Sequence, residues 1–373
     1  MMIAGEISGD LHGSYVVREL KRRDPAVRIM GVGGDRMQEA GMELLAHVND
    51  IAVVGITEAL FQIPKLMRVR SSLVKALQEQ RPSVVCLIDY PGFNLRFAKI
   101  AKQMEAKVVY YISPQLWAWR ENRVEIVRRF VDSMLVILPF EERFYREKGI
   151  QAQFVGHPLM EELMPSSDRK EFMNRMGISD TEKILALFPG SRQKEIESKF
   201  AIMAEAALAI AQITGHRLVV SMPVGFTRGA YIKYWEKGSL PNEFTFIASA
   251  SHELLKHADF ALVKSGTTTL EAALLSVPMV IMYRTSSLTH AILKRLVKIP
   301  FIGLPNIIAG RSIVPELIQE KCNAQNVAAT ALDLIRDPEK VSRVRKELSD
   351  LAALLGSRSA SKNVADILYG TFS

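Results

Sequence analysis

The chain has 373 residues, long enough for two domains that each bury a core. Its 48 lysines and arginines exceed its 40 aspartates and glutamates, and the resulting charge of +8 suits an anionic partner such as a nucleotide, a nucleic acid or an anionic lipid. Cys86 and Cys322 are the two cysteines, too few and too far apart for a disulfide framework or a cysteine metal cluster, which favours a reducing cytoplasm. No apolar run approaches the roughly 20 residues of a membrane span, so we expect a soluble or peripheral protein.

Short apolar runs alternate with helical-period stretches along the whole chain, a pattern typical of parallel sheets with crossover helices. We expect strands near residues 1–4, 27–32, 84–88, 108–112, 134–138 and 153–155, and then near 184–188, 218–221, 244–247, 260–263 and 279–282. The fold class is therefore α/β, with two Rossmann-like doubly wound sheets whose binding loops face each other across a cleft. The polar, proline-containing stretch 165–168 marks the boundary. The expected divisions are residues 1–164, 165–340 and a C-terminal helical segment 341–373 that either returns to the first domain or exchanges between subunits.

The first strand leads into a loop of small and acidic residues. Glu6, Ser8 and Gly9 are candidates for contact with a ligand in the cleft, because small residues let a ligand approach the backbone. Asp10 fits a plain helix N-cap equally well.

An apolar, basic helix is predicted over residues 56–77. No acidic residue occurs between positions 59 and 78, whereas lysines and arginines do, a composition typical of a helix lying on anionic lipid. Pro64 is expected to kink or split it. The alternative is a core-facing helix whose basic side chains reach the solvent. The residues expected to contact the membrane are Ile56, Leu60, Phe61, Ile63, Leu66 and Met67.

Asp89 follows the strand 84–88, and Pro91 and Gly92 then break the chain direction. A carboxylate at the carboxyl end of a central strand lies where α/β proteins place their chemistry, although an aspartate before proline and glycine also favours an ordinary turn. Asn94 is a further candidate for the cleft. The aromatic segment 110–120 could stack a base or a sugar, but we favour a packed wall.

Two later loops share a strand–turn–helix pattern suited to phosphate. In the first, the strand 184–188 runs into Gly190, Ser191 and Arg192, whose guanidinium can hold two phosphate oxygens. In the second, the residues after the strand 260–263 lead into a helix, whose first backbone N–H groups and dipole attract anions. Ordinary N-capping by Ser265 or Thr267 is the alternative. The residues of this second loop are Ser265, Gly266, Thr267 and Thr268, with Glu271 placed to accept hydrogen bonds from a ribose.

The stretch 272–315 again lacks acidic residues, and Asn306 adds a fixed amide near the expected cleft. Neither phosphate loop has the spacing of a Walker A motif or of a Gly-x-Gly-x-x-Gly fingerprint, which argues against a P-loop NTPase. The chain also has no Asp-x-Asp pair. A diphosphate held by a metal is therefore not expected.

Taken together and in order, several motifs resemble those of the lipid-A-disaccharide synthase family. They are GEISGD (5–10), IDYPGFN (88–94), SPQLWAWR (113–120), PFE (139–141), GHP (156–158), PGSR (189–192), SGTTTLE (265–271) and LPNIIAGR (304–311). The resemblance covers nearly the whole chain. It implies an inverting GT-B glycosyltransferase that transfers 2,3-diacylglucosamine from UDP to 2,3-diacylglucosamine 1-phosphate and releases UDP.

The same resemblance implies residue roles. Asp89 would be the general base, Arg192 with the backbone of Gly190 and Ser191 would hold the diphosphate, and Glu271 would bind the ribose. Ser265, Gly266, Thr267 and Thr268 would seat the diphosphate at the helix start, and Asn306 would lie in the donor region. Glu6, Ser8 and Gly9 would line the acceptor side. Relatives often carry a second acid where this chain has Gly92, which leaves Asp89 as the sole carboxylate of its loop.

No cofactor or metal is expected, and the implied partners are the two lipid substrates and the anionic inner-membrane surface, with no nucleic acid. The implied location is the cytoplasm, peripheral on the cytoplasmic face of the inner membrane, and a homodimer is left open. Two alternatives remain at this point: another UDP-sugar GT-B enzyme, such as a UDP-N-acetylglucosamine epimerase or a murein glycosyltransferase, and a non-enzymatic nucleotide-sugar-binding protein. The first alternative would not need the apolar, basic helix at 56–77, and the second leaves Asp89 without a role.

Overall fold

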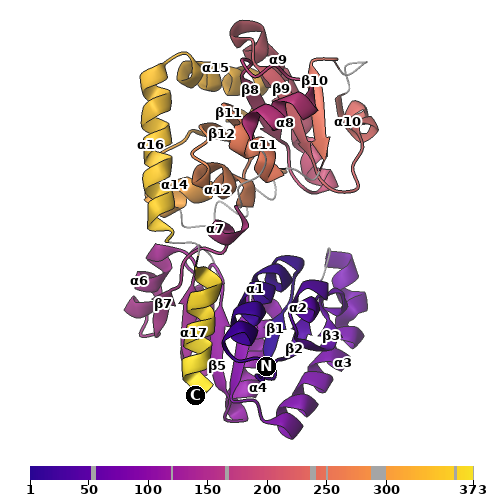
Figure 1. Ribbon diagram of the computed structural model, residues 1–373, viewed down its shortest axis with the longest axis vertical. Helices are drawn as coiled ribbons and strands as arrows, with labels where there is room; N and C mark the ends of the chain where they lie inside the picture. Colours follow the sequence, from indigo (N-terminus) through magenta and orange to yellow (C-terminus); the bar gives the residue numbers. More distant parts are fainter. Residues whose placement is uncertain are drawn as a thin grey trace. The chain divides into compact units, whose positions relative to one another are not determined.

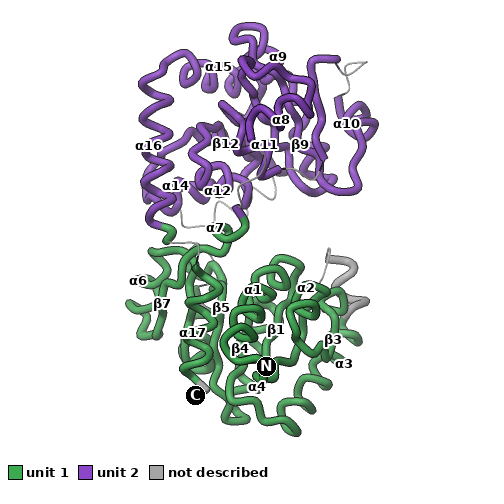
Figure 2. Tube along the Cα trace, in the orientation of Figure 1, with its two compact units in different colours: residues 1–162, 355–373 green, residues 163–354 purple. Residues whose placement is uncertain are grey.

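The computed structural model describes residues 1–51, 56–118, 121–163, 168–235, 241–248, 251–286, 300–356 and 359–372, with the backbone alone for 56–62, 122 and 372. The chain forms two compact units (Figure 2). Unit 1 comprises Met1–Glu162 and Leu355–Ser373, and unit 2 comprises Leu163–Leu354. The chain therefore crosses between the units twice.

Unit 1 is built on a parallel sheet of seven strands in the order β3-β2-β1-β4-β5-β6-β7 (Figure 1). The strands are β1 (Met2–Ala4), β2 (Met30–Gly33), β3 (Glu43–His47), β4 (Val84–Ile88), β5 (Lys107–Tyr111), β6 (Ser133–Val136) and β7 (Ala152–Phe154). The helices are α1 (Ile7–Arg23), α2 (Asp35–Glu39), α3 (Ile56–Gln80), α4 (Pro91–Gln103), α5 (Val124–Phe130), α6 (Pro139–Glu147), α7 (Leu159–Glu162) and α17 (Ala360–Phe372). Consecutive elements alternate between strand and helix for most of the unit, as a doubly wound fold requires.

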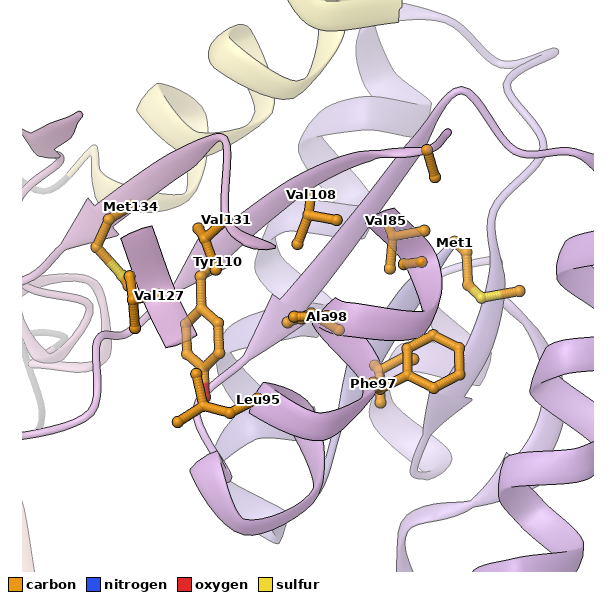
Figure 3. Packing of buried hydrophobic residues seen from close by; sticks show 14 of the residues in the cluster. Met1, Val85, Leu95, Phe97, Ala98, Val108, Tyr110, Val127, Val131 and Met134 are labelled. Carbon is orange, nitrogen blue, oxygen red and sulfur yellow. The ribbon is translucent and has the colours of Figure 1, made fainter. Parts of the chain in front are cut away.

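Helices cover both faces of this sheet, which is why its central strands are continuous apolar runs. In β4, Val85 and Leu87 face the core under α3, α4 and α5, while Val84, Cys86 and Ile88 face the core under α1 and α17. This alternation is the two-residue period of a strand. Figure 3 shows side chains of the core under α3, α4 and α5, in which Val108 and Tyr110 of β5 lie beside Ala98 and Leu95 of α4.

The last helix of the chain belongs to unit 1. Figure 1 shows α17 beside α1, and both helices contribute to the same buried cluster. Asn363 Nδ2 donates to Val155 O at 3.0 Å, and Ser361 N donates to Glu161 Oε1 at 2.7 Å. The helix before it, α16 (Pro338–Leu354), lies in unit 2. The segment 341–373 is thus divided between the two units.

Unit 2 repeats the architecture with six parallel strands in the order β10-β9-β8-β11-β12-β13. Its strands are β8 (Ile184–Phe188), β9 (Arg217–Met222), β10 (Phe244–Ala248), β11 (Phe260–Lys264), β12 (Met279–Tyr283) and β13 (Glu316–Ile318). Its helices are α8 (Arg169–Met176), α9 (Gln193–Thr214), α10 (Arg228–Trp235), α11 (Ser251–His257), α12 (Thr267–Leu274), α14 (Leu304–Ala309), α15 (Ala324–Ile335) and α16. The prediction of two doubly wound parallel sheets is confirmed.

Sequence analysis missed β3 and β13, which are both edge strands. The β3 segment, Glu-Leu-Leu-Ala-His, lacks β-branched residues, and β13 has three residues of which the first is Glu316. Edge strands are half-solvated and short, so they lack the continuous apolar run that reveals a central strand.

Helix α3 stays continuous through Pro64. Val69 and Leu73 are buried in the core. Ile63 and Met67 are 47% and 62% exposed, and Leu66 is partly buried against the core. The side chains of Ile56, Leu60 and Phe61 lie outside the described residues. The helix therefore has a core face and, separately, exposed apolar side chains.

Candidate functional site

The carboxyl ends of β1 and β4 meet where the strand order of unit 1 reverses direction. These two strands pair in parallel, with Ala4 opposite Ile88. Gly5 follows β1 and Asp89 follows β4, so the two loops predicted from sequence emerge side by side. In open α/β sheets this switch point is where ligands bind.

Asp89 and Tyr90 both adopt left-handed backbone conformations, with φ of +46° and +49°. Such a conformation costs a non-glycine residue on the order of 1–3 kcal/mol and persists only where the surroundings enforce it. Asp89 N donates to Tyr111 O at 2.9 Å, and Asp89 O accepts from Tyr110 Oη at 2.6 Å and from Asn94 Nδ2 at 2.8 Å. The turn is therefore held from β5 and from α4, which fixes where the carboxylate emerges.

Asn94 is fully buried and acts as a brace. Its amide also donates to Ile88 O at 3.0 Å, the last carbonyl of β4. Sequence analysis placed Asn94 among the residues lining a cleft, and the structure instead places its amide beneath the Asp89 turn. Its contribution to a site is to position Asp89.

Burial and, to a smaller extent, the negative charge of Glu6 raise the pKa of Asp89 to about 6. The Tyr90 backbone N–H and the charge of His12 act in the opposite direction. Glu6 is exposed and is the N-cap residue of α1. Ser8 is also exposed in the first turn, whereas Gly9 packs against Ala4. A carboxyl group whose pKa lies near 6 is largely ionised at neutral pH and still basic enough to take a proton.

The glycine loop after β1 makes room for the Asp89 turn. A Cβ on Gly5 would lie 2.2 Å from the ring of Tyr90. The Tyr90 hydroxyl donates to Ile51 O at 2.6 Å, which fixes the ring over Gly5. Asp10 does not cap its own helix, because α1 already begins at Ile7. Its carboxylate accepts from Gly34 N, Arg36 N and Met37 N and so caps α2.

A buried carboxylate, Glu141, holds the aromatic loop after β5. Its Oε1 accepts from Ser113 Oγ at 2.7 Å and Trp117 Nε1 at 2.9 Å, and its Oε2 accepts from Leu138 N at 3.1 Å. Burial raises the pKa of Glu141 to about 7 despite these donors. Tyr145 of the same helix donates to Pro114 O at 2.9 Å. The described part of the loop is thus a packed wall tied to α6.

Unit 2 has the same switch point between β8 and β11, which pair in parallel. Gly190 and Ser191 follow β8, and Ser265 and Gly266 follow β11. The two loops predicted to hold phosphate are therefore neighbours. Arg192 is exposed at the N-cap of α9.

The start of α12 carries no side-chain cap. The N-cap residue is Gly266, and neither Ser265 nor Thr267 makes the capping hydrogen bond considered from the sequence. Thr267 is exposed and Thr268 partly exposed, while Thr269 Oγ1 is turned back to Gly266 O. The first N–H groups of α12 together with these hydroxyls form a surface suited to an anion.

Glu271 and Asn306 flank this helix start in different ways. Glu271 Oε2 lies 3.5 Å from His252 Nε2. Asn306 is fully buried: its Nδ2 donates to Val314 O and Glu316 Oε1, and its Oδ1 accepts from two backbone N–H groups, of Ile313 and Val314. These contacts use all the hydrogen-bonding groups of the Asn306 side chain, so none is left to bind a ligand. The side chain instead shapes the loop beside Ser265.

Glu316 completes that loop by accepting from Ile302 N and Gly303 N at 2.8 and 2.9 Å. Ser265 Oγ donates to Ile302 O at 3.3 Å. Sequence analysis identified neither Glu316 nor Glu141 as a brace. Within the described part of the chain, no group of three or more His, Cys, Asp or Glu side chains could hold a metal ion.

Comparisons with known proteins agree with the sequence motifs. Residues 1–368 match the family model described as lipid-A-disaccharide synthetase. The chain is 40% identical over 369 residues to the lipid-A-disaccharide synthase of Trichlorobacter lovleyi, covering 99% of this chain and 96% of that protein. It is 41% identical over 337 residues to that of Pseudomonas aeruginosa, covering 90% and 89%.

Solved structures share the fold at low identity. A UDP-GlcNAc 2-epimerase from Neisseria meningitidis, bound to UDP-GlcNAc, matches with a TM-score of 0.67 at 13% identity and 99% coverage of both chains. CalG4, the calicheamicin glycosyltransferase, matches with a TM-score of 0.60 at 17% identity, covering 99% of this chain and 96% of that one. Both place the two parallel-sheet units in the GT-B class.

We predict that Glu141→Leu destabilises the protein much more than Glu141→Gln. Leucine leaves the Trp117 indole N–H and Leu138 N without acceptors, at about 1–3 kcal/mol for each buried unsatisfied group, whereas glutamine keeps one oxygen for Ser113 and Trp117. Urea unfolding followed by tryptophan fluorescence measures the difference. Equal stability of the leucine variant and the wild type would show that this carboxylate does not hold the loop.

Proposed function

The chain belongs to the lipid-A-disaccharide synthase family, and from that premise we propose how its residues divide the work of the reaction. It is a glycosyltransferase of lipid A biosynthesis, with the fold of GT-B enzymes. Our proposal for the substrates is 2,3-diacylglucosamine on UDP as donor and 2,3-diacylglucosamine 1-phosphate as acceptor. The products are the lipid A disaccharide 1-phosphate and UDP, with inversion at the anomeric carbon.

The observation that carries the mechanism is the braced turn at Asp89. Its carboxylate takes the proton of the attacking acceptor hydroxyl while that oxygen bonds to the anomeric carbon. The bond from this carbon to the UDP oxygen breaks, and UDP leaves with the electron pair. One base suffices because the leaving diphosphate needs no proton, unlike the leaving group of a glycosidase.

We assign the departing UDP to the loops of unit 2. The start of α12 supplies backbone N–H groups and its dipole, an effect of roughly 0.3–2 kcal/mol, along with the hydroxyls of Thr267 and Thr268. Arg192 adds a guanidinium at the start of α9, and Glu271 accepts from the ribose. Since the chain has no Asp-x-Asp pair, we propose that these groups act on the diphosphate without a metal.

We place the protein on the cytoplasmic face of the inner membrane, as a peripheral protein. Within the described residues, no helix is both long and apolar enough to cross a bilayer. The support for membrane contact is α3, where Ile63 and Met67 are exposed among the basic residues Lys65, Arg68 and Arg70. Both proposed substrates carry fatty acyl chains and lie in the membrane, so a surface that binds the membrane would bring the enzyme to them.

The purified protein should release UDP from UDP-2,3-diacylglucosamine only when the lipid 1-phosphate acceptor is present. Mass spectrometry and NMR of the product should show a disaccharide of inverted anomeric configuration, and EDTA should leave the rate unchanged. UDP-N-acetylglucosamine, which lacks the two fatty acyl chains, is the control and should not turn over. UDP release without acceptor, or epimerised sugar, would contradict the proposal.

Asp89→Asn should lower turnover about a hundred- to ten-thousand-fold, the usual contribution of a general base. Binding of UDP should be retained, because the residues assigned to it lie in unit 2. In the wild type, turnover should rise with pH through about 6, as Asp89 loses its proton. This rise of turnover with pH should disappear in Asp89→Asn and persist in Glu141→Gln.

The matched control is Asp35→Asn, which removes a carboxylate of unit 1 that is 84% exposed. Its turnover should equal that of the wild type. Near-normal turnover of Asp89→Asn would show that Asp89 is not the general base.

The double substitution Ile63→Ser and Met67→Ser should reduce binding to vesicles that contain anionic lipid. Burying one such side chain contributes about 1.5–3 kcal/mol, so we expect at least roughly a tenfold loss in vesicle co-sedimentation. Leu66 is left intact because it also packs on the core. Val224→Ser with Ile232→Ser, two exposed apolar residues of unit 2, is the control. Unchanged binding of the first variant would exclude this face of α3.

A further inference from the structure

A basic pocket of about 780 Å³ adjoins the α12 loop in unit 2. Ser265 lines it, and so do four basic side chains, of Lys194, Lys199, Lys264 and Arg284, against two acidic ones, of Glu195 and Glu320. The pocket lies at the carboxyl ends of β11, β12 and β13, and the first turns of α9 form another wall. None of the four basic residues was assigned a role from the sequence motifs.

Lys199 is the unusual member of this group because its side chain is buried, with 5% exposure of the residue. Its ammonium donates to Ser198 Oγ at 2.9 Å, the one hydrogen bond it makes to a described residue. Burial and the neighbouring charge of Lys264 lower the pKa of Lys199, while the negative charge of Glu195 acts in the opposite direction. A buried ammonium needs an opposite charge to offset its lost hydration.

Glu195 provides only part of that charge. Its Oε1 lies 2.8 Å from Lys264 Nζ, and its Oε2 accepts from Ser191 N at 3.2 Å. Two ammonium groups therefore share one carboxylate, and that carboxylate is already paired with Lys264. The cluster keeps a positive charge beside a pocket large enough for a substrate group.

Glu195 also occupies the place expected for an anion at the start of α9. Gly190 has a φ of +133°, and a Cβ there would lie 2.7 Å from Glu195 Cβ and 2.8 Å from Glu195 Oε2. Burial tends to raise the pKa of Glu195, but Lys264 and the backbone N–H groups of Ser191 and Arg192 lower it overall. The turn that sequence analysis expected to hold phosphate thus holds the chain's own carboxylate.

We propose that the pocket of Lys199 and Lys264 binds a phosphate group of a substrate, and that Glu195 takes the place of this anion while the pocket is empty. The phosphate oxygens receive charge-assisted hydrogen bonds from both ammonium groups, which are shorter and stronger than neutral ones. Ser265 connects the pocket to the start of α12. The inference rests on the proposed function for its ligands: the diphosphate of the UDP donor and the 1-phosphate of the acceptor share this chemistry.

The test uses the full-length protein with three substitutions in the pocket. Lys199→Met and Lys264→Met keep the length of the side chain and remove its charge, and Glu195→Gln keeps the shape of the competing carboxylate without its charge. Lys170→Met is the matched control, because Lys170 is exposed on α8 of the same unit and does not line the pocket. Thermal unfolding of each variant confirms that it is folded.

Isothermal titration with inorganic pyrophosphate at low salt is the first measurement. We expect at least about a tenfold weaker affinity in each lysine variant, as for a lost charge-assisted contact. Glu195→Gln should bind more tightly than the wild type, because the internal competitor is neutral, and Lys170→Met should match the wild type. Undetectable binding to the wild type, or equal affinities in the wild type and both lysine variants, would overturn the proposal.

Titration with UDP and the KM of each substrate distinguish the two sources of phosphate. If the lysine variants bind UDP more weakly and have a raised KM for the donor, the pocket holds the donor diphosphate. Unchanged UDP affinity with a raised acceptor KM assigns it to the acceptor phosphate. A wild type that binds pyrophosphate through these lysines but does not transfer sugar would refute the proposed function and leave the pocket in place.

Discussion

The Asp89 turn is the constraint on which the proposed chemistry of unit 1 depends. Two successive non-glycine residues, Asp89 and Tyr90, hold left-handed backbone conformations that an isolated chain would avoid. The surrounding fold enforces them through Tyr110, Tyr111 and Asn94, whose hydrogen bonds take up both backbone groups of Asp89. Because the backbone of Asp89 is held so completely, its side chain is the part left to react.

In unit 2, where we propose that the anions bind, positive groups gather around the loops that follow β8 and β11. The start of α12 offers backbone N–H groups without a side-chain cap, while the start of α9 is occupied by Glu195. One of the two proposed phosphate surfaces is therefore open, and the neighbouring one is occupied by an internal carboxylate paired with Lys264. An incoming phosphate that displaced Glu195 would exchange one charged contact for another, so the net gain in binding free energy would be smaller than the contacts suggest.

Buried central strands could be predicted from the sequence, and with them the positions of the functional loops. The strands 84–88 and 184–188 have the predicted bounds, because a strand buried on both faces is a continuous apolar run. Asp89 and Ser265 follow directly from strand ends. The supporting residues Asn94, Asn306 and Glu141 could not be predicted in this way. They act through hydrogen bonds to backbone and side-chain groups of other segments, and the spacing of residues does not reveal these contacts. Glu195 carried a local signal, as an acid at the third position of α9, where helix starts are commonly capped.

Asp89 and Glu141 of unit 1 both have a raised pKa, and geometry distinguishes the proposed base from the other carboxyl group. The pKa of Glu141 is about 7 and that of Asp89 about 6, so the pKa values alone would favour Glu141 as the base at neutral pH. Glu141, however, is 1% exposed, and its oxygens already accept from Ser113, Trp117 and Leu138. A hydroxyl could reach it only by breaking the loop that it holds. Asp89 is partly exposed at the switch point, and the supporting residues bind its backbone alone, so its raised pKa fits the proposed base, whereas that of Glu141 accompanies a structural support.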